Sequence, residues 1–278
     1  MKPPLLPQTP GDWLACYRFR VLTPDGRLLS PELFGKELGV SGDTVRRWEK
    51  NQVAPTNSDL QRISALCRLG PVEIAFLFDA FTEPRLEQTP DRRRFCALAG
   101  RLLSSEFPAY VFDSLFYVRA WNSYVSILNL PHYPPMGEHI VESILRSTPP
   151  RPRAPDPSER QARWLRDFWF STANLCGSEP YKRVVSRLAQ NPDFCQRWMR
   201  LALEPDYDED RMVLTPFYFD FPNLGRFRAS TSVVPIPPNY YFREFIPVDD
   251  LGRKRWQDAR VQGPATVSIL DRIHWADD

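Results

Sequence analysis

The sequence predicts an α+β protein in two parts, an all-α bundle followed by an antiparallel sheet domain with helices. Up to residue 81 apolar residues recur at helical spacing, whereas from residue 108 they fall in short aromatic runs. Residues 1–105 hold 9 aromatic side chains, while the longer remainder holds 27. We therefore predict domains at 1–82 and 106–278, separated by a linker or connecting helix over 83–105. The net charge of only +2 excludes a strongly basic nucleic-acid coat.

The first part is expected to contain short helices with clear start and stop signals. Ser30 and Pro31 supply an N-cap and a first-turn proline, and Gly39 ends the helix that they begin. Ser41 caps the next helix, in which Val45 and the tryptophan three residues later face inward. The expected helices span 12–21, 30–39, 41–50, 59–69 and 71–81.

The segment LFGKELGVSGDTVRRWEK (33–50) holds two of these helices and the sharp turn between them. It resembles the XRE/Cro-type helix-turn-helix family through Leu38-Gly39-Val40-Ser41, Thr44-Val45, Trp48-Glu49 and Pro55. The resemblance implies an all-α helix-turn-helix bundle that binds double-stranded DNA, with its second helix in the major groove. A helical bundle that merely exposes its arginines to solvent is the alternative.

The resemblance also assigns DNA contacts to individual residues. The whole set is Ser30, Ser41, Gly42, Asp43, Thr44, Arg46, Arg47, Lys50 and Asn51. Within it, base reading falls to Gly42, Asp43, Thr44 and Arg47, and phosphate contacts fall to Arg46, Lys50 and Asn51. Arg47 is the candidate for guanine because its guanidinium matches both the O6 and the N7 acceptors.

The second part is expected to place helices between two groups of strands. Aromatic and β-branched runs predict two short strands within 109–121 and three long ones at 212–221, 226–236 and 239–248. Helical spacing predicts helices over 122–130, 137–147, 158–204 and 249–259. Prolines concentrate in PHYPP (131–135) and PPRPRAPDP (149–157), which predicts irregular loops there.

Residues 107–122, FPAYVFDSLFYVRAWN, resemble the start of the MmyB-like ligand-binding domain, a PAS-like sensor that follows an XRE-type domain in that family. The match consists of Pro108-Ala109, Val111, Asp113, Val118 and Trp121-Asn122. A second match, to a later pair of helices in that family, consists of Phe194 and Trp198. The resemblance implies a PAS-like antiparallel sheet domain that binds a fatty acid or another small lipophilic ligand. It also fits the order of two strands, helices and three strands.

Aromatic residues and strand arginines are the candidates for contact with such a ligand. They are Tyr117, Arg119, Trp121, Trp164, Phe168, Trp169, Phe217, Tyr218, Phe219, Arg228 and Arg243. The arginines are included because a carboxylate in an apolar cavity needs a cation or several donors. The alternative is a plain structural core for the aromatic residues and a solvated outer face for the arginines.

Other chemistry is weakly represented in the sequence. Five separated cysteines without a CxxC pair indicate reduced thiols. The pattern favours neither a disulfide framework nor a zinc site. The motifs of nucleotide-binding loops, zinc hydrolases and serine hydrolases do not occur, so we expect no catalytic residue, no metal and no resident cofactor. His139 could bind haem, but we expect a surface histidine. The acidic run at 206–210 could bind calcium, but we expect a solvated loop.

These observations predict a cytoplasmic one-component transcription regulator. There is no signal-like apolar run and no stretch of 18 apolar residues, so we expect no association with a membrane. A homodimer is expected because a single helix-turn-helix covers too little DNA for useful specificity. The alternatives are a DNA-binding regulator whose second domain only dimerises, without a ligand, and an enzyme fused to a helix-turn-helix.

Overall fold

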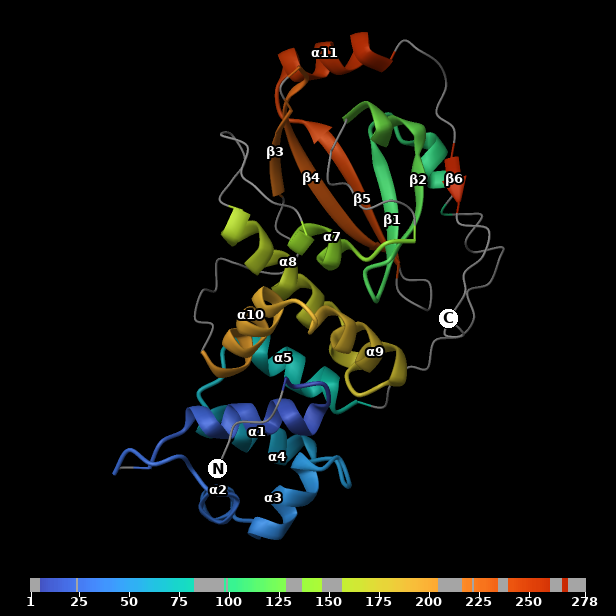
Figure 1. Cartoon of the computed structure of the whole chain (residues 1–278). Coiled ribbons are helices and arrows are strands. Elements are labelled where there is room, and N and C mark those ends of the chain that lie inside the picture. Colours follow the sequence, from blue (N-terminus) through green and yellow to red (C-terminus); the bar gives the residue numbers. More distant parts are fainter. Residues whose placement is uncertain are drawn as a thin grey trace. The chain divides into compact units, whose positions relative to one another are not determined.

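The protein combines helices with one antiparallel sheet, which confirms the predicted α+β class (Figure 1). In this computed structural model the chain forms two units, each discontinuous in sequence. The helical unit joins Met1–Arg85 with Trp169–Met212, and the sheet unit joins Leu86–Phe168 with Val213–Asp278. The residues that the structure describes are 6–23, 25–82, 98, 100–128, 137–146, 157–204, 217–221, 223–234, 240–260 and 267–269. Within these ranges, no helix is both long and apolar enough to cross a membrane.

The helical unit begins with the five predicted helices. They are α1 (Pro10–Arg20), α2 (Pro31–Leu38), α3 (Gly42–Glu49), α4 (Asn57–Leu66) and α5 (Pro71–Ala80). The predicted caps form: the Ser30 hydroxyl accepts from the Leu33 amide, and the Ser41 hydroxyl accepts from the Thr44 amide. The unit is completed by the 3-10 helix η2 (Ala173–Leu175), α9 (Glu179–Leu188) and α10 (Pro192–Leu203).

A cluster of four buried rings holds these two chain segments together. The ring of Trp13 lies 5.1 Å from Phe76, 5.7 Å from Trp169 and 5.6 Å from Trp198. Phe76 stacks on Trp169 at 4.4 Å. The grouping differs from the predicted division, which placed every residue after 106 with the sheet. The chain from Trp169 onward belongs with α1–α5 because Trp169, at the end of α8, and Trp198 of α10 complete this core.

Arg20 adds a polar connection between α10 and the first helices. Its guanidinium forms a buried ion pair with Glu73 of α5. It also donates to the carbonyl oxygens of Leu201 and Ala202, at 2.9 and 3.0 Å. The last carbonyls of a helix have no partner within that helix, so Arg20 supplies hydrogen bonds to two groups that α10 itself leaves unsatisfied. Helix α10 is therefore fixed to α1 by packing and by charge.

The sheet unit contains six strands in the order β3-β4-β5-β1-β2-β6, and all neighbours are antiparallel. They are β1 (Ala109–Asp113), β2 (Val118–Asn122), β3 (Phe217–Phe221), β4 (Gly225–Val234), β5 (Tyr240–Pro247) and β6 (Val267–Ile269). The two early strands and three later strands are confirmed, although residues 212–216 of the predicted third strand lie outside the described part. Pairing of β1 with β5 joins the two groups into one sheet.

The helices of the sheet unit are η1 (Ser123–Leu128), α7 (Ile140–Arg146), α8 (Pro157–Ser171), whose last residues belong to the helical unit, and α11 (Asp250–Arg260). The expected helix at 122–130 is a short 3-10 helix. One face of the sheet packs against the helical residues at 100–104, where Leu102 belongs to the same buried cluster as Val111 and Phe242. The other face, which we call the aromatic face, carries Tyr110, Phe112, Trp121, Phe219, Phe227, Tyr241, Arg243 and Phe245.

Candidate functional site

Helices α2 and α3 meet at a tight turn that depends on glycine. Gly39 has a φ of 72°, in the left-handed region where other residues are strained, and it ends α2. A Cβ atom on Gly42 would lie 2.9 Å from the Cα atom of Glu32. Side chains cannot approach a backbone so closely, so Gly42 lets the start of α3 lie against the start of α2. The structure thus gives Gly42, a predicted base contact, a packing role.

Helix α3 buries one side and exposes the other. Val45 and Trp48 are almost completely buried, whereas Asp43, Arg47 and Lys50 are exposed. The Ser41 hydroxyl caps the helix through the Thr44 amide at 3.0 Å and lies 2.9 Å from the Thr44 hydroxyl. The buried side fixes the rotation of α3 about its axis. Its exposed side therefore presents a defined set of polar groups.

Arg46 occupies the junction between the two helices and is bound by carboxylates from both. It forms an ion pair with Glu32 of α2 and a second one with Asp43, whose Oδ1 lies 2.6 Å from Nη1. The sequence pattern placed Arg46 and Asp43 among the DNA contacts and did not include Glu32. The signal that could have indicated Glu32 is its position directly after Pro31, in the first turn of α2.

Asn51 has an intramolecular role that the sequence reasoning missed. It follows α3 with a φ of 56°, and its side-chain oxygen accepts a hydrogen bond from the Gly11 amide at 2.8 Å. Its side-chain nitrogen donates to the Thr9 hydroxyl at 2.8 Å. Asn51 therefore holds the start of α1 against the end of α3. Asparagine often adopts the left-handed conformation directly after a helix, so this structural role of Asn51 could have been predicted from its position.

Helix α1 contacts α3 at one side and α10 at another (Figure 1). Arg18 of α1 is buried and lies 2.6 Å from a carboxylate oxygen of Glu49, and it donates to the carbonyl oxygen of Leu29. Glu49 therefore faces α1 and does not contribute to the exposed side of α3. The sequence reasoning assigned no role to Arg18, because nothing local indicates a partner 31 residues away.

Several predicted ligand-binding residues meet on the aromatic face of the sheet unit. The Arg243 guanidinium lies 4.1 Å above the Trp164 ring, and its Nε donates to the Thr231 hydroxyl at 2.7 Å. Trp164 and Phe168 of α8 both contact Phe116, at 5.9 and 5.5 Å between ring centres. Trp121 and Phe219 lie on this face as well. The Tyr117 side chain is half-buried and contacts the His139 ring at 5.2 Å.

Three other predicted ligand residues do not lie on the aromatic face. Trp169 packs in the core of the helical unit. Tyr218 and Arg228 pair with each other across β3 and β4, are exposed, and lie on the opposite face of the sheet. Alternation along a strand explains the difference, because neighbours of an inward residue point outward. These placements do not support the predicted ligand contacts. The side chain of Phe217 lies outside the described part of the structure.

Arg119 is already neutralised within the sheet unit. Its guanidinium forms a buried ion pair with Asp113, with distances of 2.6 and 2.7 Å. The other oxygen of Asp113 accepts from the amides of Leu115 and Tyr117, at 3.0 and 2.9 Å. Asp113 therefore shapes the turn between β1 and β2. The pair gives Arg119 a structural role in place of the predicted contact with a ligand carboxylate.

His139 is buried, so the expectation of a surface histidine is wrong. Its ring contacts Phe168 at 5.3 Å in addition to Tyr117, and its Nδ1 accepts from the Glu142 amide at 3.4 Å. This last contact lies at the start of α7. The acidic run at 206–210 lies outside the described residues, so the structure says nothing of the calcium alternative.

The described cysteines are free thiols, as predicted, and three of the four are buried. Burial raises the pKa of Cys16 to about 12 and that of Cys67 to about 12, and it also raises the pKa of Cys176. These thiols stay protonated near neutral pH, and a protonated thiol is a poor nucleophile and a poor metal ligand. Cys96 lies outside the described residues.

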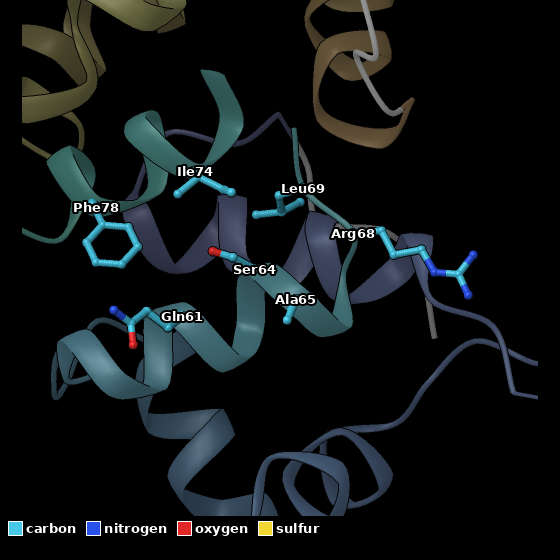
Figure 2. Close-up of a pocket in the computed structure, with 7 residues that line it drawn as sticks. All are labelled: Gln61, Ser64, Ala65, Arg68, Leu69, Ile74 and Phe78. Carbon is cyan, nitrogen blue, oxygen red and sulfur yellow. The ribbon is translucent and has the colours of Figure 1, made fainter. Parts of the chain in front are cut away.

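A hollow of about 430 Å³ lies between α4 and α5 (Figure 2). Its lining is Gln61, Ser64, Ala65, Arg68, Leu69, Ile74 and Phe78. Figure 2 shows the guanidinium of Arg68 extending away from the other six side chains. None of the predicted site residues lines this hollow.

The α2–α3 pair is the candidate functional site. It combines a fixed helix with an exposed side that carries cations and hydrogen-bonding groups. A scan against models of protein families gives no match, and a search of curated proteins finds no significant relative. The function is therefore inferred from the residues and their geometry.

Proposed function

We propose that the protein is a one-component transcription regulator that binds double-stranded DNA through α3. The observation that carries this proposal is the exposure of Arg47 and Lys50, with a half-buried Thr44 beside them, on a helix whose Val45 and Trp48 are buried. The turn at Gly39 and the capped start of α3 support a helix-turn-helix, in which the second helix enters the major groove. Such a helix needs a rigid base and a free polar edge, and α3 has both.

In the proposed complex, Arg47 reads a guanine and Lys50 neutralises a phosphate. The planar guanidinium donates two parallel hydrogen bonds to O6 and N7 of guanine, whereas a lysine ammonium suits a single phosphate oxygen. Ser30, which caps the start of α2, would make a further contact with the DNA backbone. Asn51 is less suited to a phosphate contact, because its amide already binds Gly11 and Thr9.

We further propose that the sheet unit is a PAS-like sensor for a small lipophilic ligand such as a fatty acid. The antiparallel sheet of two early and four later strands, with helices beside it, supports this class. The aromatic face supplies apolar surface, and Arg243 supplies a buried cation next to Trp164. A ligand carboxylate brought to this region would be stabilised by such a cation. The protein would act as a cytoplasmic homodimer, with the ligand favouring one arrangement of the dimer.

Arg47→Ala is the direct test of the proposed DNA contact. We expect selection from a pool of random duplexes to lose base preference at one position, with a cost of about 1–3 kcal/mol at that position. The matched control is Arg200→Ala on α10, an exposed arginine of the same unit, which should leave the selected sequence unchanged. If Arg47→Ala selects the same sequence as the original protein, Arg47 is not the reading residue.

Extraction of the purified protein followed by mass spectrometry tests the proposed ligand. We expect a lipid at a stoichiometry near one per chain. If no lipid is found, and no fatty acid in a panel of chain lengths shifts the thermal unfolding midpoint, the sensor proposal fails. The sheet unit would then be a ligand-free dimerisation domain, which is the remaining alternative for a DNA-binding regulator.

A further inference from the structure

Arg46 is the point at which acidic and basic groups meet beside the proposed DNA-reading side chains. Glu32 approaches it from α2, and Asp43 approaches it from one turn earlier on α3. The three side chains are partly or largely exposed: 42% for Arg46, 56% for Glu32 and 87% for Asp43. They form a surface network and not a buried core pair, so an approaching polyanion can compete for Arg46.

The arrangement of the two helices explains why Glu32 reaches Arg46. Gly42 has no side chain, and a Cβ atom at this position would lie only 2.9 Å from the Cα atom of Glu32. This contact brings the start of α2 beside the first turns of α3. A larger residue at position 42 would separate the helices and move the Glu32 carboxylate away from Arg46.

The network lowers the positive charge of the exposed side of α3. Arg46, Arg47 and Lys50 are its cations, and Glu49 is turned to Arg18 and is mostly buried. Glu32 and Asp43 offset two of these three charges. A protein that neutralises phosphates with free cations gains affinity for any DNA sequence, because each neutralised phosphate releases counterions.

We propose that Glu32 and Asp43 hold Arg46 away from DNA phosphates and so limit binding to DNA of unrelated sequence. Arg46 then contributes little to the affinity for DNA of any sequence, and Arg47 discriminates between sequences. This inference rests on the proposed DNA-binding function. It adds Glu32 as a specificity-determining residue and gives Asp43 a role other than base reading.

The test is the affinity of the full chain for a random-sequence duplex, measured over a series of salt concentrations. The variant Glu32→Gln/Asp43→Asn keeps side-chain shape and releases Arg46. We expect roughly 3- to 10-fold tighter binding at moderate salt, and a salt-dependence slope steeper by about 0.9, as for one additional phosphate contact. Adding Arg46→Gln to this variant should remove both gains.

The matched control is Glu179→Gln/Glu204→Gln, on α9 and α10. It makes the same change in net charge and also frees two ion-paired cations, because Glu179 pairs with Lys182 at 2.9 Å and Glu204 pairs with Arg200 at 2.5 Å. We expect it to leave the slope unchanged. An equal effect of the control and of Glu32→Gln/Asp43→Asn would show a general charge effect and overturn the proposal.

Two further outcomes separate this proposal from the proposed function. If the original chain binds the duplex and the release of Arg46 changes neither affinity nor slope, the charge network has no role and DNA binding stands. If neither the original chain nor any variant binds DNA, the proposed function itself fails. Should the double variant unfold, Asp43→Asn alone tests the same point at the most exposed member of the network, with about half the effect on charge.

Discussion

Replacement of Trp198 by alanine is expected to lower the free energy of unfolding of the helical unit by about 3–5 kcal/mol, the usual cost of emptying a buried aromatic site. Trp198 is completely buried and contacts Trp13 at 5.6 Å and Phe194 at 5.1 Å. Its indole nitrogen donates to the carbonyl oxygen of Pro7 at 3.1 Å, so the change also leaves that acceptor without its partner. A loss of this size is comparable with the whole stability of a small domain.

Denaturant unfolding followed by circular dichroism checks this expectation, because helix content reports the unit without relying on tryptophan fluorescence. Met199→Ala is the control, since Met199 is the next residue of α10 and is only half-buried. We expect it to cost less than about 1.5 kcal/mol. An unchanged midpoint for Trp198→Ala would mean that α10 does not stabilise α1–α5.

Replacement of Asp113 by alanine is expected to destabilise the sheet unit by about 3–5 kcal/mol, because it removes the carboxylate that forms the buried ion pair with Arg119. The same change removes the acceptor for the amides of Leu115 and Tyr117. Thermal unfolding of the full chain measures the loss. Asp220→Ala, an exposed carboxylate on β3, should change the unfolding midpoint little.

A second substitution separates the charge effect from the loss of the turn. Arg119→Met in the Asp113→Ala background removes the positive charge that Asp113 neutralised and keeps an apolar stem of similar length. We expect it to restore part of the lost stability, because an apolar pair often replaces a buried ion pair without loss. If the double variant is no more stable than Asp113→Ala, the main contribution of Asp113 is its hydrogen bonds to the turn.

The sequence predicted the helices of the first part well because their signals are local. Ser30 with Pro31, and Ser41 with Gly39, define starts and stops within a few residues, and the structure places the ends of α2 and α3 there. The α2–α3 pair and the exposure of Arg47 follow from the same short-range pattern. The predicted DNA contact of Arg47 remains a prediction.

The division of the chain could not be predicted in the same way. Trp13 contacts Trp169 and Trp198, which lie far along the sequence, and nothing near any of these residues indicates the others. Aromatic residues at helical spacing predict burial but not the partner. For the same reason, Trp169 was grouped with Trp164 and Phe168 although they lie in different units.

The candidate ligand residues show a similar limit. Tyr218 and Phe219 were both predicted to contact the ligand, although neighbouring strand residues point to opposite faces. Alternation does not show which of these faces the helix α8 covers. That choice depends on β1 and β5, which are distant in sequence from β3. The pairing of Arg119 with Asp113 was easier to predict from the sequence, because the two residues are close in a hairpin and carry opposite charges.

The chain passes from the helical unit to the sheet unit, returns at Trp169, and leaves again after Met212. A recombination event with a single breakpoint therefore cannot exchange one unit for another. A fusion that keeps only residues 1–85 inherits Trp13 and Phe76 without the two tryptophans that cover them. A transplant of the intact helical unit needs two junctions, one that bridges the excised residues 86–168 and one at Met212. The architecture thus favours inheritance of both units as one block.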